Sequence, residues 1–149
     1  MTVTELVPAL ADAIAFAEGY YVAGSRAAVN NNPGNLTVDI TGQGIGTDGM
    51  FIKYANPTDG FNALYKQVEM MIMGTSAFYN PSMSIAEIAK RYASTTPDEW
   101  INWANNVAAR LGVSPETTLN DLLISGGAIF ASGVVIALGV LLYIFLHKR

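Results

Sequence analysis

Residues 122–146 carry no charged side chain, and this run limits the structures open to the chain more than any other feature. A helix of this length extends roughly 37 Å, which exceeds the ~30 Å hydrocarbon core of a bilayer. Tyr143 and Phe145 suit the interface between lipid and water, and the basic end HKR closes the run. The sequence therefore predicts a folded domain, residues 1–120, followed by a transmembrane anchor with a short basic tail, residues 121–149.

Composition excludes several classes of function. The chain of 149 residues has no cysteine, and its one histidine, His147, lies near the C-terminus. We therefore expect no histidine-based catalytic triad, no metal site with imidazole or thiolate ligands, and no cofactor. Residues 1–121 hold all 12 acidic side chains and six of the eight basic ones. Because an acidic surface repels phosphates, nucleic acid is not an expected partner.

The N-terminal segment predicts a helix and not a secretory signal. It has no basic start, and Glu5 and Asp12 interrupt its apolar residues. Apolar side chains recur there at helical spacing, and Thr4 is placed to cap the helix at its N-terminus. The members of this apolar face are Leu6, Leu10, Ile14 and Ala17.

The middle of the chain predicts a small β-hairpin. Residues 36–41 and 50–55 have the composition of two short strands, and the glycine-rich segment 42–49 joins them. The glycines do not form a phosphate-binding loop, because no Lys-Ser or Lys-Thr pair follows them and no helix begins there.

Three further helices are predicted from capping residues and apolar periodicity, over residues 57–74, 84–93 and 96–112. The second and third begin with the spacing of a capping box, S-x-x-E and T-x-x-E, and the first and third end at glycine. With the hairpin, these helices give an α+β, mainly helical domain. One C-terminal transmembrane helix follows it.

Several motifs occur in a set order along the chain: FAEGYY with NNNPGNL, then FIKYANPTDGFNAL, then IAKRYA and VAARLGV. This ordered set resembles the lysozyme-like lytic transglycosylase domains of bacteriophage virions, found in tail proteins and in phages with an internal membrane. The resemblance covers residues 9–120 and implies a lysozyme-like fold. In one departure, a serine follows RYA, where such domains more often have a proline.

The resemblance implies that Glu18 is the catalytic acid/base that cleaves the β-1,4 bond between N-acetylmuramic acid and N-acetylglucosamine. A general acid at neutral pH needs a raised pKa, and apolar surroundings raise it by disfavouring the carboxylate. The residues expected to supply these surroundings are Phe16, Ala17, Tyr20 and Tyr21.

The same motifs supply candidate substrate-binding residues. The amides of Asn31, Asn32 and Asn35 either hold the turn or bond the N-acetyl groups of the substrate. The resemblance implies that Tyr92 stabilises the reacting sugar, and packing within its helix is the alternative. Trp103 is expected to pack the last helix.

Three acids on or beside the hairpin, Asp39, Asp48 and Asp59, are candidates for a second carboxylate in a hydrolytic mechanism. A lytic transglycosylase, which the resemblance implies, needs a single acid/base. In that mechanism the muramyl 6-hydroxyl attacks within the substrate and leaves a 1,6-anhydro product. The sequence alone leaves both mechanisms open.

The sequence thus predicts a membrane-anchored enzyme of a phage virion that cleaves peptidoglycan and opens the cell wall locally during genome entry. Its expected partners are peptidoglycan glycan strands, the lipid membrane and other virion membrane proteins. We expect it in the internal membrane of the virion or, alternatively, in the bacterial inner membrane with its domain facing the periplasm. The alternative function is that of a structural or wall-binding virion protein with the same fold and little turnover.

Overall fold

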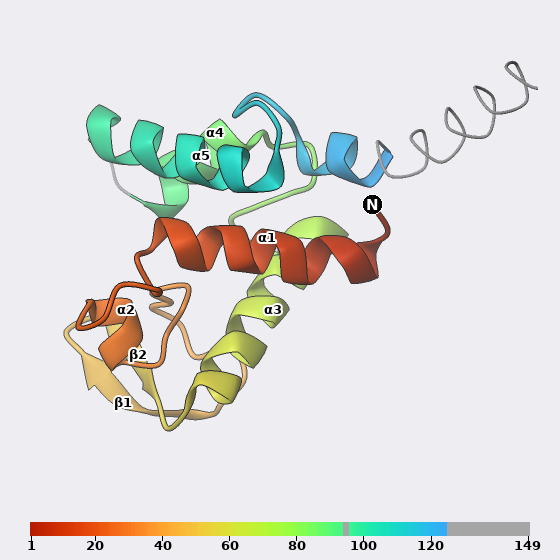
Figure 1. The fold of residues 1–149 in the computed structure, drawn as a ribbon. Coiled ribbons are helices and arrows are strands. Elements are labelled where there is room, and N and C mark those ends of the chain that lie inside the picture. Colours follow the sequence, from red (N-terminus) through yellow and green to blue (C-terminus); the bar gives the residue numbers. More distant parts are fainter. Residues whose placement is uncertain (94–95, 125–149) are drawn as a thin grey trace, which may run out of the picture.

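A computed structural model describes residues 1–93 and 96–124 of the chain. This part is α+β and mainly helical, with a small two-stranded antiparallel sheet, as the sequence predicts. Figure 1 shows helix α1 (Val3–Ala17) between α3 (Pro57–Met73) on one side and the pair α4 (Ile85–Tyr92) and α5 (Pro97–Leu111) on the other. The hairpin and the short helix α2 (Arg26–Val29) lie beyond the C-terminal end of α1.

Helix α1 begins two residues earlier than predicted. Its N-cap is Thr2, whose hydroxyl accepts a hydrogen bond from the backbone N–H of Glu5 at 3.3 Å. The Glu5 carboxylate in turn accepts the N–H of Thr2 at 2.8 Å. The prediction of Thr4 as the cap is wrong because this reciprocal capping box satisfies two N-terminal donors at once.

The hairpin pairs β1 (Gly44–Asp48) with β2 (Phe51–Tyr54), so β1 lies in the segment predicted to be the connecting loop. The prediction of a strand at residues 36–41 is wrong. Side chains bond the backbone there: the Asn32 amide oxygen accepts the Leu36 N–H at 2.8 Å. The Leu36 carbonyl accepts the Ile52 N–H at 2.9 Å, but such local bonds compete with strand pairing, and the regular pairing with β2 is made after the turn by Gly44–Asp48.

The three later helices form where the sequence predicts them: α3 (Pro57–Met73), α4 (Ile85–Tyr92) and α5 (Pro97–Leu111). Gly74 and Gly112 end α3 and α5 in the left-handed conformation, each with a φ of 70°. The expected capping box of α4 is present. The one expected at α5 is not, because the side chain at its N-cap makes no capping hydrogen bond.

One core joins the helices and β2. Apolar faces of α1, α3, α4 and α5 meet in it, and burial of these faces is the main force that holds the domain together. Its largest fully buried side chains include Leu6, Ile14, Tyr54, Leu64, Met71, Ile85 and Val107.

The core continues into the uncharged run. Leu119 is fully buried and Leu122 is 2% exposed, and both pack in the same cluster as the helices. The backbone N–H of Ile85 bonds the carbonyl of Thr117 at 3.0 Å, which ties this C-terminal turn to the start of α4. Packed structure therefore extends to Leu122, two residues past the boundary predicted after residue 120.

The predicted transmembrane helix falls almost entirely on residues 125–149, which lie outside the described part of the chain. Among residues 1–93 and 96–124, no helix has both the length and the hydropathy needed to cross a bilayer.

Candidate active site

Glu18 lies at the point where α1 ends. It is the C-cap residue, and its backbone N–H bonds the carbonyl of Ile14. Gly19 follows with a φ of 74°, a conformation that glycine adopts at little cost and that turns the chain away from the helix axis. A rigid helix therefore fixes the backbone from which the carboxyl group projects.

Two neutral donors from distant parts of the chain hold the Glu18 carboxylate. The side-chain amide of Asn35 donates to Oε2 at 2.8 Å. The indole Nε1–H of Trp103, on α5, donates to Oε1 at 2.7 Å. Burial of the carboxyl group raises the pKa of Glu18 above its ordinary value, and these two hydrogen bonds act in the opposite direction.

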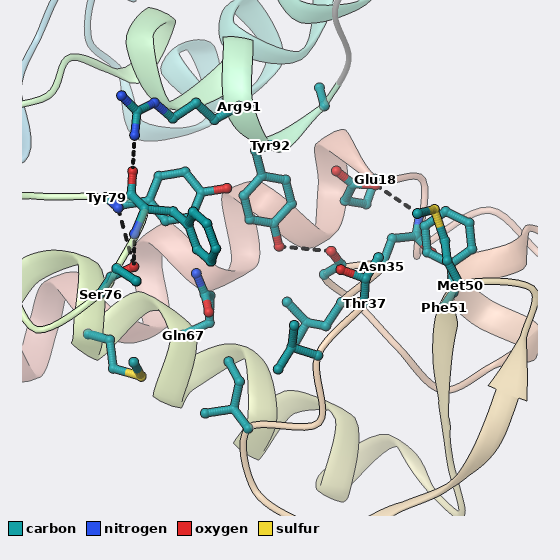
Figure 2. A pocket seen from close by; sticks show the side chains of 18 residues that line it. Glu18, Asn35, Thr37, Met50, Phe51, Gln67, Ser76, Tyr79, Arg91 and Tyr92 are labelled. Atoms are coloured by element: carbon teal, nitrogen blue, oxygen red, sulfur yellow. Dashed lines mark hydrogen bonds between the residues drawn. The ribbon is translucent and has the colours of Figure 1, made fainter.

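Glu18 borders a cleft of about 530 Å³. Figure 2 shows Glu18 and Asn35 on one side of Tyr92, with Tyr79 and Arg91 on the other. Among the described residues that line the cleft, Glu18 is the only acid and Arg91 the only base. The cleft thus combines one carboxyl group with mostly neutral polar and apolar walls.

Asn32 has a structural role in the asparagine loop, residues 30–35 with the sequence NNNPGN. It is completely buried, and its amide donates to the carbonyls of Leu36 at 2.9 Å and Ile52 at 2.8 Å. With the bond that its oxygen accepts from the Leu36 N–H, it joins the loop to β2. These contacts leave its amide no route to a substrate in the cleft.

Asn31 and Asn35 share an unusual backbone conformation, with φ values of 50° and 45°. The Asn31 amide donates to the carbonyl of Tyr54 at 3.1 Å, and Asn31 is not among the residues lining the cleft. Asn35 does line the cleft, and its amide oxygen is buried without a hydrogen-bond partner. Of the three predicted asparagines, Asn35 is therefore the one that both contacts Glu18 and lines the cleft.

Tyr92 lies at the end of α4 and lines the cleft. Its hydroxyl donates to the carbonyl of Gly34 at 2.8 Å, and its ring stacks on Trp103 with centroids 5.0 Å apart. A Cβ at Gly34 would lie 2.7 Å from the Tyr92 hydroxyl, so the loop can approach Tyr92 this closely only with glycine at position 34. Tyr92 therefore couples the asparagine loop to the α5 residue that holds Glu18.

The three aspartates proposed as second carboxylates have other contacts. Asp39 accepts the backbone N–H groups of Gly42 and Gly44 in a turn. Asp48 lies 3.3 Å from the Arg26 guanidinium, and Asp59 accepts the Asn56 amide at 2.8 Å at the start of α3. None of the three lines the cleft in the described part of the chain.

The surroundings of Glu18 differ from those that the sequence suggests. Phe16 and Tyr21 are exposed, and the Arg110 guanidinium lies over their rings at 4.9 and 5.8 Å from the centroids. Sequence reasoning assigned Trp103 to packing; it is indeed buried, but it also donates to Glu18. No local pattern could reveal that bond, because the two residues are 85 positions apart.

No protein-family model, curated protein or solved structure matches this chain.

Proposed function

We propose that this chain is a lytic transglycosylase with a lysozyme-like domain, which cleaves the MurNAc-GlcNAc β-1,4 bond of peptidoglycan with Glu18 as its acid/base. The observation that supports this best is the partly buried Glu18 carboxyl group, held by Asn35 and Trp103, at the border of a cleft without a second acid among its described lining residues.

In the first step, protonated Glu18 donates its proton to the glycosidic oxygen as the bond to C1 of the muramyl sugar breaks. Burial, which raises the pKa of Glu18, keeps this proton in place toward neutral pH. The resulting carboxylate accepts hydrogen bonds from Asn35 and Trp103, so both bonds favour the charged form that the first step produces.

In the second step, the Glu18 carboxylate takes the proton of the muramyl 6-hydroxyl, whose oxygen bonds to C1 and closes a 1,6-anhydro ring. The proton is returned to Glu18, and no water enters the reaction. A two-carboxylate hydrolase instead places its acids about 5–5.5 Å or 6.5–9.5 Å apart across the scissile bond. The turn and capping contacts of Asp39, Asp48 and Asp59 support the one-acid mechanism.

Product mass distinguishes the two mechanisms. We expect mass spectrometry of digested peptidoglycan to show muramyl ends that are lighter by about 18 mass units, one water, than reducing ends. Substitution of Asp39, Asp48 or Asp59 by asparagine should leave this product unchanged. Products that carry only reducing ends would contradict the one-acid mechanism, and loss of turnover in one aspartate variant would then identify the second carboxylate.

The predicted membrane anchor bears on where the enzyme acts. The uncharged run supports a membrane-bound enzyme, in a virion membrane or a bacterial inner membrane, that opens the wall during phage genome entry. Leu122 packs in the core at the start of that run, which leaves little chain between domain and anchor. Such an enzyme would act on wall close to the membrane that holds it.

The Trp103 bond predicts a change in pH dependence. In a Trp103→Phe chain the carboxylate loses a donor that stabilises its charged form, so the pKa of Glu18 rises further. The alkaline limb of the kcat/KM profile should move to higher pH, and the maximum should fall about tenfold. Trp100→Phe is the matched control, since Trp100 lies on the same helix but packs under Lys90 at 4.8 Å. Identical profiles for both variants would contradict a positioning role for Trp103.

A further inference from the structure

Phe78 is an exposed aromatic residue on a well-held backbone. Its side chain is 66% exposed and lines the cleft. The Ser76 hydroxyl accepts the backbone N–H groups of Phe78 and Tyr79, each at 3.2 Å. From α4, the Arg91 guanidinium donates to the Phe78 carbonyl. These bonds hold the backbone at Phe78 in place, while the domain leaves the phenyl ring exposed.

The opposite wall of the cleft also exposes apolar side chains. Val38 and Met50 line the cleft and are 61% and 67% exposed. Figure 2 shows Ser76, Tyr79 and Arg91 on one side, with Met50 on the other and Glu18 between them. Exposed apolar side chains that gather at a cleft keep an unfavourable contact with water until a ligand covers them.

Polar groups are placed among these apolar walls. Gln67 and Asn35 supply amides, and Thr37 and Ser76 supply hydroxyls, all within the lining of the same cleft. A suitable ligand therefore has apolar faces together with a rim of hydroxyl and amide groups. A β-linked N-acetylhexosamine has this form, because its axial C–H bonds make the ring faces apolar while its hydroxyls and N-acetyl group lie at the edge.

We propose that Phe78 is a sugar-stacking residue, which binds one N-acetylhexosamine ring of a β-1,4-linked strand at the side of the cleft opposite the hairpin. This inference rests on the proposed function for the identity of the ligand. Phe78 binds the strand and does not touch the reacting atoms. Its removal therefore raises KM and leaves kcat nearly unchanged, because the lost contact is made equally in the ground and transition states.

Binding is measured with the full chain in detergent, in a Glu18→Gln background that does not consume the ligand. The probe is a β-1,4-linked tetramer of N-acetylglucosamine, titrated by calorimetry. We expect Phe78→Ala to weaken binding roughly tenfold, and Phe78→Tyr to retain it, because tyrosine keeps the aromatic face. Ile45→Ala is the matched control: Ile45 is 67% exposed on β1 but does not line the cleft, and affinity should not change.

Equal affinities of the Phe78→Ala and parent chains would overturn the inference, as would an absence of measurable binding by the parent. The outcome is separable from that of the proposed function. If the wild-type chain releases no products but Phe78→Ala still weakens tetramer binding, the enzymatic proposal fails and the sugar-stacking role holds. If the wild type cleaves peptidoglycan while Phe78→Ala binds as tightly as the parent, the stacking role alone fails.

Discussion

A Glu18→Gln chain should clear peptidoglycan at least about 10²–10⁴-fold more slowly than wild type. Glutamine keeps the size of the side chain and still accepts a hydrogen bond from Trp103, but it has no proton to donate and cannot take one back. Zymography on peptidoglycan-containing gels measures the loss, and product release from purified sacculi gives its size.

The same substitution, which lowers activity, should raise the stability of the folded chain near neutral pH. Because burial raises the pKa of Glu18, the folded chain holds this proton to higher pH than the unfolded chain does. Stability is therefore lost as pH rises from the ordinary glutamic acid value through the raised one, and no such loss occurs below that window. Glutamine does not ionise, so Glu18→Gln should have a higher Tm than wild type near neutral pH and an equal Tm at low pH.

Asp48→Asn is the control for both measurements, because Asp48 is an exposed acid on β1 that does not line the cleft. It should keep wild-type clearing. Equal clearing by the wild-type and Glu18→Gln chains would refute the assignment of Glu18. No clearing by either would favour the alternative function, a structural or wall-binding protein that has the fold without the turnover.

Gly60→Ala should cost about 3 kcal/mol or more of folding free energy and lower Tm by about 10 °C or more. Gly60 lies in the first turns of α3, and a Cβ there would come within 1.8 Å of the Asn31 carbonyl oxygen and 2.9 Å of Pro33 Cδ. The overlap with backbone cannot be relieved by a rotamer change. The asparagine loop would have to move, and with it the amide that holds Glu18.

Thermal unfolding followed by circular dichroism tests this prediction. Asn62→Ala, two residues further along the same helix and exposed, should leave Tm unchanged or slightly raised, because alanine has the higher helix propensity. An unchanged Tm in Gly60→Ala would show that the loop does not pack on α3 as described. Where the variant folds, reduced activity should accompany reduced stability.

Local features of the sequence were enough to predict most of the helices. The α4 capping box and the glycines that end α3 and α5 act over three or four residues, so a short stretch of sequence is enough to predict them. The error at Thr4 concerned which of two nearby threonines caps α1, and it moved the helix start without altering its buried face.

The hairpin was predicted less well, because strand pairing depends on what else binds the backbone. Residues 36–41 have strand-like composition, yet the Asn32 side chain accepts the Leu36 N–H, and Asp39 forms the following turn. The glycine-rich segment then pairs with β2 through an irregular register between Gly44 and Gly46. Such competition between side chains and partner strands is not visible in single-sequence propensities.

The sequence by itself determined α1, α3, α4 and α5, the acid at the end of α1 and the turn that follows, because these depend on short-range capping and periodicity. Only the tertiary structure decided which residues serve Glu18. Asn32, for which the sequence left open a role in the turn or in substrate binding, is buried as a link to β2. Trp103, predicted only to pack, bonds the carboxyl group from 85 residues away. Burial raises the pKa of Glu18 against the opposing effect of its two hydrogen bonds, and this environment forms only once α5 packs against α1.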